Sequence, residues 1–233
     1  TYAKLLFEGL PEVGKSDLPT IEVELVKFSE VRHLPKLIRH YAYYRRVLKA
    51  TRSADVVLAL DPVSVGLPAM YAAQKTGKPF VVKIVGDYAW EQGQQRFGIT
   101  QTLDEFIKEK HVPFPVRILQ RIQSRVARSA IRIIVPSEYL KSIVMTWGAS
   151  TSFSTSILEE KIEVIYNAVS VKEIGTVPEA VEKLSRPLVV NVGRLVPWKH
   201  IGGVIDATAG IFGASLAIIG DGPEHATLAR HAN

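Results

Sequence analysis

The chain has 233 residues, 47% of them hydrophobic, which is enough for one large or two small α/β domains with real cores. It has no cysteine, which excludes disulfides, thiol nucleophiles and cysteine metal sites and fits a reducing cytoplasm. A net charge of +6 and a pI near 9.4 indicate attraction to polyanions: nucleotides, anionic lipid or nucleic acid.

The start of the chain does not look like a secretory signal, because Lys4 and Glu8 interrupt any apolar core. No stretch of the sequence is long and apolar enough to span a bilayer. We therefore expect a cytoplasmic protein, with a peripheral position at the inner face of the membrane left open.

The first part of the chain predicts alternating helices and strands. Apolar and charged residues alternate from Ile21 to Glu24, which is typical of a strand, and Gly77 stands where a helix ends in a left-handed cap. In order, the predicted elements are helix 2–10, strand 21–28, helix 34–52, strand 55–60, helix 62–76 and strand 79–85.

The last of these strands leads into residues 86–91, which read GDYAWE. Aromatic faces that stack on sugar rings and carboxylates that accept hydroxyl protons suit a sugar-binding surface. The competing interpretation is a packed loop with Trp90 as its anchor, and from the residues alone we favour it.

Residues 102–108 and 114–129 predict two further helices. In the second, Arg117, Arg121, Arg125 and Arg128 share one face, with Ile118, Leu119, Ile122 and Val126 on the other. Such a basic helix either lies on an anionic membrane or is simply a surface helix with a solvated side, and the second reading is the commoner.

A strand over 131–135 then leads to Ser137, which has the position and type of a helix N-cap for a helix over 139–147. The Ser/Thr-rich loop 149–156 carries no assigned chemistry, and residues 162–166 predict another strand.

Residues 187–228 predict strand, basic loop, helix, strand, glycine turn and helix. The run 188–192 is continuously apolar, apart from Asn191, which suits a strand covered on both faces. Arg194 and Lys199 follow it, and Gly220 and Gly222 follow the next strand at 216–219. Ligands collect at the carboxyl ends of parallel strands, so the loops predict either a pyrophosphate site or merely solvated charges and tight turns. A nicotinamide fingerprint is not supported, because His225 takes the third glycine's place.

The sequence VGRLVPWK followed by GDGPE closely resembles the donor-binding half of the retaining GT-B glycosyltransferases of family 4. The resemblance implies an α/β, GT-B-like fold of two Rossmann-like parallel-sheet domains, the second incomplete. It implies that Arg194 and Lys199, with Gly193, hold the donor's diphosphate. The turn of Gly220, Asp221, Gly222 and Pro223 would lie on the nucleotide side.

The same resemblance assigns the acceptor and sugar side to Tyr88, Trp90 and Glu91, with Asp87 as the catalytic candidate. Family members often have a His-Asp pair there, and this sequence has Gly86 in place of the histidine. The family also usually has glycine after the loop lysine, where this sequence has His200. The resemblance further implies no metal and no cofactor, the substrate being a UDP- or GDP-sugar.

We predict an acceptor-side domain over 1–169, a linker over 170–186 and a partial nucleotide-sugar domain over 187–233. Residues 167–170, NAVS, resemble the family's N-G-V-D exit from its first domain. The family would have a strand and a Gly-Gly loop before residue 2 and paired glutamates after residue 233. We therefore expect a chain truncated at both ends and, as it stands, an inactive fragment.

The implied reaction is retaining transfer of a sugar from a nucleoside diphosphate sugar to an unidentified acceptor: a glycan, a lipid-linked molecule or a small molecule. Three alternatives stay open: a GT-B epimerase of nucleotide sugars, a catalytically incomplete nucleotide-binding fragment and a nucleic-acid-binding protein. We do not expect a nucleic-acid partner, because the basic residues are spread over several helices and no binding module is present.

Overall fold

The protein is described by a computed structural model that covers residues 2–13, 21–147, 157–168, 175–176 and 179–232. The chain forms two compact units. The first comprises residues 1–92 and 101–167, and the second comprises residues 93–100 and 168–233. The domain limits expected from the sequence, at 169 and 186, stay a prediction.

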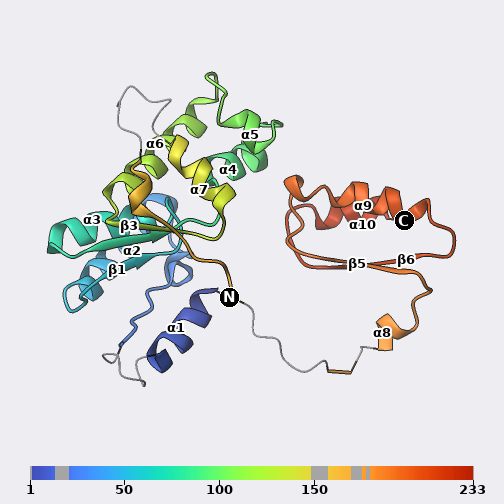
Figure 1. The fold of residues 1–233 in the computed structure, drawn as a ribbon, viewed down its shortest axis with the longest axis horizontal. Coiled ribbons are helices and arrows are strands. Elements are labelled where there is room, and N and C mark those ends of the chain that lie inside the picture. The colour runs from blue at the N-terminus through green and yellow to red at the C-terminus, as the bar shows by residue number, and fades with distance from the viewer. Residues whose placement is uncertain (1, 14–20, 148–156, 169–174, 177–178, 233) are drawn as a thin grey trace. The chain divides into compact units, whose positions relative to one another are not determined.

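The first unit is built on a parallel sheet in the order β1-β2-β3-β4 (Figure 1). Its strands are β1 (Val57–Ala59), β2 (Phe80–Lys83), β3 (Arg132–Val135) and β4 (Ile162–Val164). The helices around it are α1 (Tyr2–Val13), α2 (Lys36–Thr51), α3 (Gly66–Thr76), α4 (Tyr88–Arg96), α5 (Leu103–Phe106), α6 (Phe114–Ser129) and α7 (Glu138–Thr146). Two 3₁₀ turns, η1 (Phe28–Val31) and η2 (Glu159–Lys161), complete the unit.

The strands form the core because they are short runs of apolar, mostly β-branched residues. Val82, Ile133 and Val135 are fully buried, and Met70 of α3 and Val126 of α6 pack against them from the helix layer. A parallel sheet needs cover of this kind because crossover helices lie on its faces. The core therefore holds rigid the sheet edge at which the loops begin.

Local capping signals act as the sequence predicts. Gly77 has φ 67° and ends α3 in the left-handed conformation. Ser137 accepts a hydrogen bond from the amide of Leu140 and is the N-cap of α7, as predicted. Thr102 and Glu105 form a reciprocal capping box at α5.

The strand predicted over 21–28 is wrong. Residues 21–27 belong to no sheet of the described structure, and η1 follows them. Val26 and Phe28 nevertheless pack against the core, and the hydroxyl of Tyr43 donates to the carbonyl of Val26. The alternating apolar residues here belong to a segment that packs one side against α2. They do not belong to a strand with a ladder of backbone hydrogen bonds.

The second unit contains β5 (Leu188–Val192) and β6 (Ser215–Ile219), which are parallel, with α9 (Ile201–Ala209) and α10 (His225–His231). α8 (Glu179–Glu182) precedes the sheet and η3 (Pro197–Lys199) lies between β5 and α9. Leu195, Ile201, Ile205 and Leu228 form its small core, against Leu216 and Ile218 of β6.

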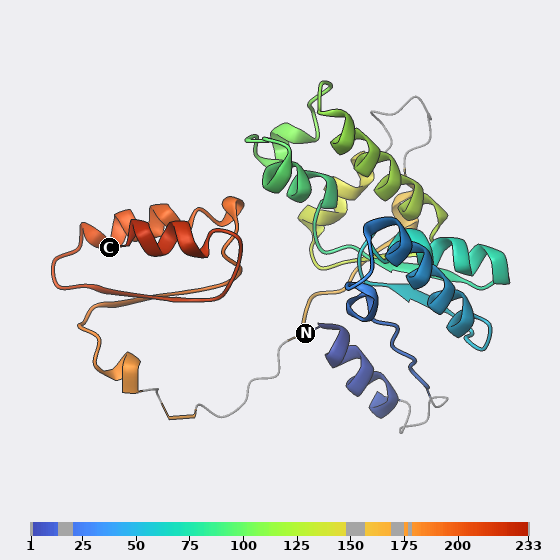
Figure 2. The same ribbon diagram turned by 180° about the vertical axis from the view of Figure 1, so that it is seen from behind.

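The expectation that β5 is covered on both faces is wrong for the described residues. α9 and α10 lie on one side of the two-stranded sheet (Figure 2). Val190, Val192 and Ile219 are 51%, 73% and 53% exposed. They alternate with residues turned to the helices, so the described part of this sheet has one open apolar face.

His200 stands at the start of α9 with φ 48° and ψ 40°. It is the one described residue other than glycine with a positive φ. The left-handed region crowds the Cβ of an L-residue and costs roughly 1–2 kcal/mol. The backbone thus explains why the resembled family has glycine at this place.

Replacing His200 with Gly should raise the free energy of unfolding of the second unit by roughly 1 kcal/mol, because the strain at φ 48° is removed. Urea unfolding followed by a probe in this unit measures the change. His200→Ala is the control, since it removes the imidazole but keeps the Cβ. Equal stability of the two variants would contradict this account.

Candidate functional site

The basic loop of the second unit is held by backbone contacts with the glycine turn. Beyond the ends of β5 and β6, the amide of Gly193 donates to the carbonyl of Ile219 at 3.0 Å. The amide of Leu195 donates to the carbonyl of Asp221, also at 3.0 Å. The two loops therefore extend the parallel pairing of the strands past the sheet.

Two glycines make this approach sterically feasible. A Cβ at Gly220 would lie 1.8 Å from the carbonyl oxygen of Gly193, and one at Gly222 would lie 2.2 Å from that of Leu195. No side chain fits at these distances without moving the backbone. Gly220 and Gly222 are thus needed for the packing of the two loops, whatever else they contact.

Arg194 and Lys199 project from this frame. Leu195 and Val196, between them, are 3% and 1% exposed and anchor the loop, while both cations are exposed. η3 then carries the chain from Pro197 to Lys199. Neither cation makes a hydrogen bond or an ion pair within the part of the chain that the structure describes. The loop thus presents two uncompensated charges on a fixed backbone.

Asp221 forms a hydrogen bond within the glycine turn. Its Oδ1 accepts a hydrogen bond of 2.7 Å from the amide of Gly222. Asp221 and Pro223 are exposed, and Gly222 is partly covered. The predicted contacts of these residues with a nucleotide stay a prediction.

Asp87 lies inside the first unit, between β2 and α4. It is 2% exposed, and its Oδ1 and Oδ2 accept hydrogen bonds of 2.9 Å from the amide of Trp90 and the indole of Trp147. Burial raises the pKa of Asp87 above its ordinary value, and the hydrogen bonds from Trp90, Gln123 and Trp147 limit that rise.

This arrangement makes Asp87 a buried cap of α4. The predicted contact of its carboxylate with sugar or acceptor is untested, but the carboxylate as it lies does not reach the surface. Gln123 lies on α6 and Trp147 is the residue after α7, so no local pattern in the sequence marks this cluster.

The aromatic residues next to Asp87 are anchored. The hydroxyl of Tyr88 lies 2.9 Å from that of Ser64, and the indole of Trp90 donates to the carbonyl of Gln101 at 2.9 Å. Both side chains are partly buried. They therefore hold α4 against its neighbours. Trp90 is an anchor, as the competing interpretation expects, but the loop of that interpretation is wrong, because residues 88–96 form a helix. The role of both side chains toward a sugar stays a prediction.

Glu91 occupies the space beside Gly86. A Cβ at Gly86 would lie 2.3 Å from Oε1 of Glu91. Where family members often have histidine, this chain thus has a carboxylate in the volume that a side chain at 86 would need. Histidine at 86 would require Glu91 to move.

A buried lysine in the first unit was not predicted from the sequence. Lys83, the last residue of β2, is 1% exposed, and its Nζ donates to Oδ1 of Asn167, beyond β4, at 2.9 Å. A lysine that ends an apolar strand was the available signal. The contact ties the end of β2 to the segment that leaves the unit.

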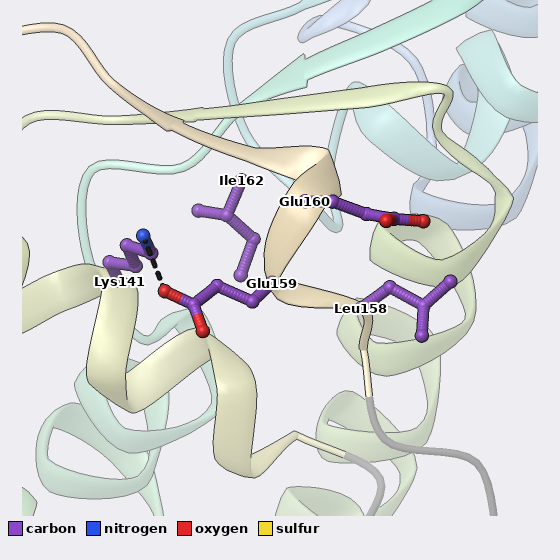
Figure 3. Close-up of a pocket in the computed structure, with 5 residues that line it drawn as sticks. All are labelled: Lys141, Leu158, Glu159, Glu160 and Ile162. Carbon is purple, nitrogen blue, oxygen red and sulfur yellow. Dashed lines mark ion pairs between the residues drawn. The ribbon is translucent and has the colours of Figure 1, made fainter.

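A hollow of about 550 Å³ between α7 and η2 is not a convergent site. Figure 3 shows the carboxylate of Glu159 facing Lys141 while Glu160 and Leu158 point the other way. The 2.9 Å pair with Lys141 lowers the pKa of Glu159.

Among the described residues, no group of three His, Cys, Asp or Glu side chains could hold a metal ion.

The described helices include none that is long and apolar enough to cross a membrane.

Trp147→Phe should lower the free energy of unfolding by about 2–3 kcal/mol near neutral pH, because Asp87 loses a buried charge-assisted hydrogen bond. The loss raises the pKa of Asp87 further. Protonated Asp87 needs no indole donor, so the destabilisation should shrink as the pH falls through that raised pKa and grow as the pH rises.

Urea unfolding of wild type and variant over a range of pH measures this effect. Trp90→Phe is the matched control, because its indole donates to the neutral carbonyl of Gln101. A Trp147→Phe effect that does not change with pH would show that Asp87 is not ionised against this indole.

Comparison with known proteins identifies the family of this chain. A family model described as a glycosyl transferase 4-like domain matches residues 8–152. No curated protein matches the sequence.

Among solved structures, the chain is similar to Anabaena Alr3699/HepE in complex with UDP and glucose. The TM-score is 0.58 at 17% identity, over 82% of this chain and 47% of that one. The same protein with UDP gives a TM-score of 0.54 at 17% identity, over 82% and 48%.

A putative UDP-N-acetylglucosamine 2-epimerase from Listeria monocytogenes reaches a TM-score of 0.47 at 13% identity, over 97% and 54%, which is too low to support an inference. The chain spans about half the length of the structures it matches.

The similarity to HepE shows the fold, α/β with parallel sheets and GT-B-like, as the motifs predict. The family model covers more than half of the chain, including all of the sheet of the first unit up to β3. The protein therefore belongs to the glycosyl transferase 4-like domain family, the group that its sequence resembles.

Proposed function

We propose that this protein acts in the transfer of a sugar from a nucleoside diphosphate sugar to an acceptor, with Arg194 and Lys199 holding the diphosphate. One observation carries the proposal: two exposed, uncompensated cations stand on a loop whose backbone is fixed by Gly220 and Gly222. A diphosphate supplies the charge that such a loop lacks.

The chemistry explains why two cations are needed. As the bond from the sugar's anomeric carbon to the diphosphate breaks, negative charge grows on the leaving oxygens. Fixed positive groups stabilise that charge more than they stabilise the bound donor, which lowers the barrier. Arginine and lysine also form charge-assisted hydrogen bonds with phosphate oxygens.

We further propose that the protein, and no metal, supplies this positive charge. The sequence lacks the Asp-x-Asp pair that metal-dependent transferases use. The resemblance to family 4 adds that the anomeric configuration is retained. UDP is the first nucleotide to test, because HepE is a structural relative solved with UDP and with UDP and glucose.

We also propose that the protein is cytoplasmic and that an anionic membrane is a second partner, which the protein contacts peripherally. The arginines of α6 have exposed or partly exposed side chains, and Phe114 at its start is 70% exposed. The apolar face predicted for this helix is only partly buried, since Ile118 is 39% exposed and Gln123 takes a core position. Each arginine near an anionic surface contributes about 1 kcal/mol.

Arg194→Ala and Lys199→Ala should each weaken UDP binding by about tenfold, which corresponds to one charge-assisted hydrogen bond. Calorimetry with UDP and with GDP measures the affinity. Arg230→Ala is the matched control, because Arg230 lies on α10 of the same unit and its Nε donates to a carbonyl of its own helix. Unchanged affinity in both loop variants would overturn the proposal.

In a full-length enzyme that includes the paired glutamates expected from the family, UDP-glucose and a panel of acceptor sugars should give a product whose anomeric configuration equals that of the donor, read by proton NMR of the new linkage. An inverted product would contradict retention. An altered nucleotide sugar formed without any acceptor would identify an epimerase, and UDP binding with no turnover would identify a nucleotide-binding fragment.

A further inference from the structure

Three helices of the first unit that contact one another in sequence are basic and form a layer. α2 packs against α3, and α3 packs against α6, so the three helices form a continuous surface (Figure 1, Figure 2). None of the three contains an aspartate or a glutamate. The lysines and arginines whose side chains the structure describes are Arg39, Arg45, Arg46 and Lys49 on α2, Lys75 on α3, and Arg117, Arg121, Arg125 and Arg128 on α6.

Little of this charge is compensated. Arg46 pairs with Glu30 of η1, and this is the one ion pair that the described residues form with the layer. Arg45 donates to the hydroxyl of Tyr41, and the guanidinium of Arg125 lies 5.5 Å from the ring centre of Tyr71, so both keep their charge. The layer therefore carries a strong positive potential toward solvent.

Within the layer, α2 and α3 border a shallow hollow that is open to solvent and lined by Tyr44, Tyr71, Gln74 and Lys75. Tyr71 is 41% exposed, and Gln74 and Lys75 are exposed as well. The ring of Tyr41 lies 6.5 Å from that of Tyr44 and continues the aromatic surface along α2.

Within the first unit, the hollow is separate from residues 86–91. α3 begins after the carboxyl end of β1, and Gln74 and Lys75 lie in its last turn. At 1.5 Å per residue, this places them about 13 Å further along the helix from its first residue. The hollow thus lies toward the opposite end of the sheet from Asp87 and the start of α4.

We propose that this hollow binds an anionic oligosaccharide. Flat tyrosine rings suit the apolar faces of pyranose rings, the Gln74 amide both donates to and accepts from hydroxyls, and Lys75 with the neighbouring arginines attracts carboxylate or ester groups. Under the proposed function, on which this reading rests, the ligand is the acceptor chain, held at a distance from residues 86–91 of the same unit.

The binding itself is testable without nucleotide or turnover. The full chain is titrated with an oligogalacturonate, with a neutral dextran oligomer of equal length, with a single-stranded oligonucleotide and with phosphatidylglycerol vesicles. We expect the oligogalacturonate to bind, more weakly as salt rises, and dextran to bind at least about tenfold more weakly. Equal binding of dextran would overturn the anionic class.

Variants then locate the site. Tyr71→Ala and Lys75→Gln should each weaken oligogalacturonate binding by about tenfold, and Tyr71→Phe, which keeps the ring, should change it less than about threefold. Lys110→Gln is the charge-matched control, since Lys110 is exposed outside the layer, and it should have no effect beyond about twofold. Circular dichroism of each variant confirms folding.

Unchanged binding in Tyr71→Ala and Lys75→Gln overturns the proposal. The same holds if only the oligonucleotide or the vesicles bind and lose affinity in these two variants, because the layer would then serve nucleic acid or membrane. Loss of UDP binding in Arg194→Ala leaves this result untouched, so the failure of one proposal is distinguishable from that of the other.

Discussion

The close backbone approach of two loops is the constraint on which the candidate donor site depends. Gly193 and Leu195 donate to the carbonyls of Ile219, at the end of β6, and of Asp221, just after it. The absence of side chains at Gly220 and Gly222 leaves room for the carbonyls of Gly193 and Leu195. The buried pair Leu195 and Val196 then fixes the loop from below. Arg194 and Lys199 gain their positions from this frame and not from ion pairs of their own, so their charge remains available to a ligand.

Features with a local cause could be predicted from the sequence. Ser137 caps a helix through an amide three residues on, Gly77 ends one through its own φ, and α6 follows from its 3.6-residue period. The cluster around Asp87 could not be predicted, because Trp147 lies 60 residues away and reaches the carboxylate only through the packing of α7. In the structure the carboxylate is buried and caps α4, with hydrogen bonds from Trp90, Gln123 and Trp147, and its contact with sugar or acceptor stays a prediction.

Two errors share one physical origin. Residues 21–27 alternate without forming a strand, and the run from Leu188 to Val192 is nearly all apolar without being covered on both faces by the described residues. Hydrophobic pattern reports which side chains favour burial. It does not report whether a neighbouring strand or helix is in place to bury them or to take their backbone hydrogen bonds.

The distribution of charge shows the same limit at a larger scale. Along the sequence the basic residues are spread over several helices, which argues against a dedicated polyanion surface. In space, α2 and α6 lie on either side of α3, and the acid-free stretches become one layer. The net charge of +6 is therefore unevenly distributed over the chain. Acidic residues elsewhere offset part of the layer's charge in the total, but they do not screen it at short range. Crossovers of the same hand place α3 and α6 on one face of the sheet, and α2 joins them through its packing on α3, so helix composition has to be compared between neighbours in the fold and not between neighbours in the chain.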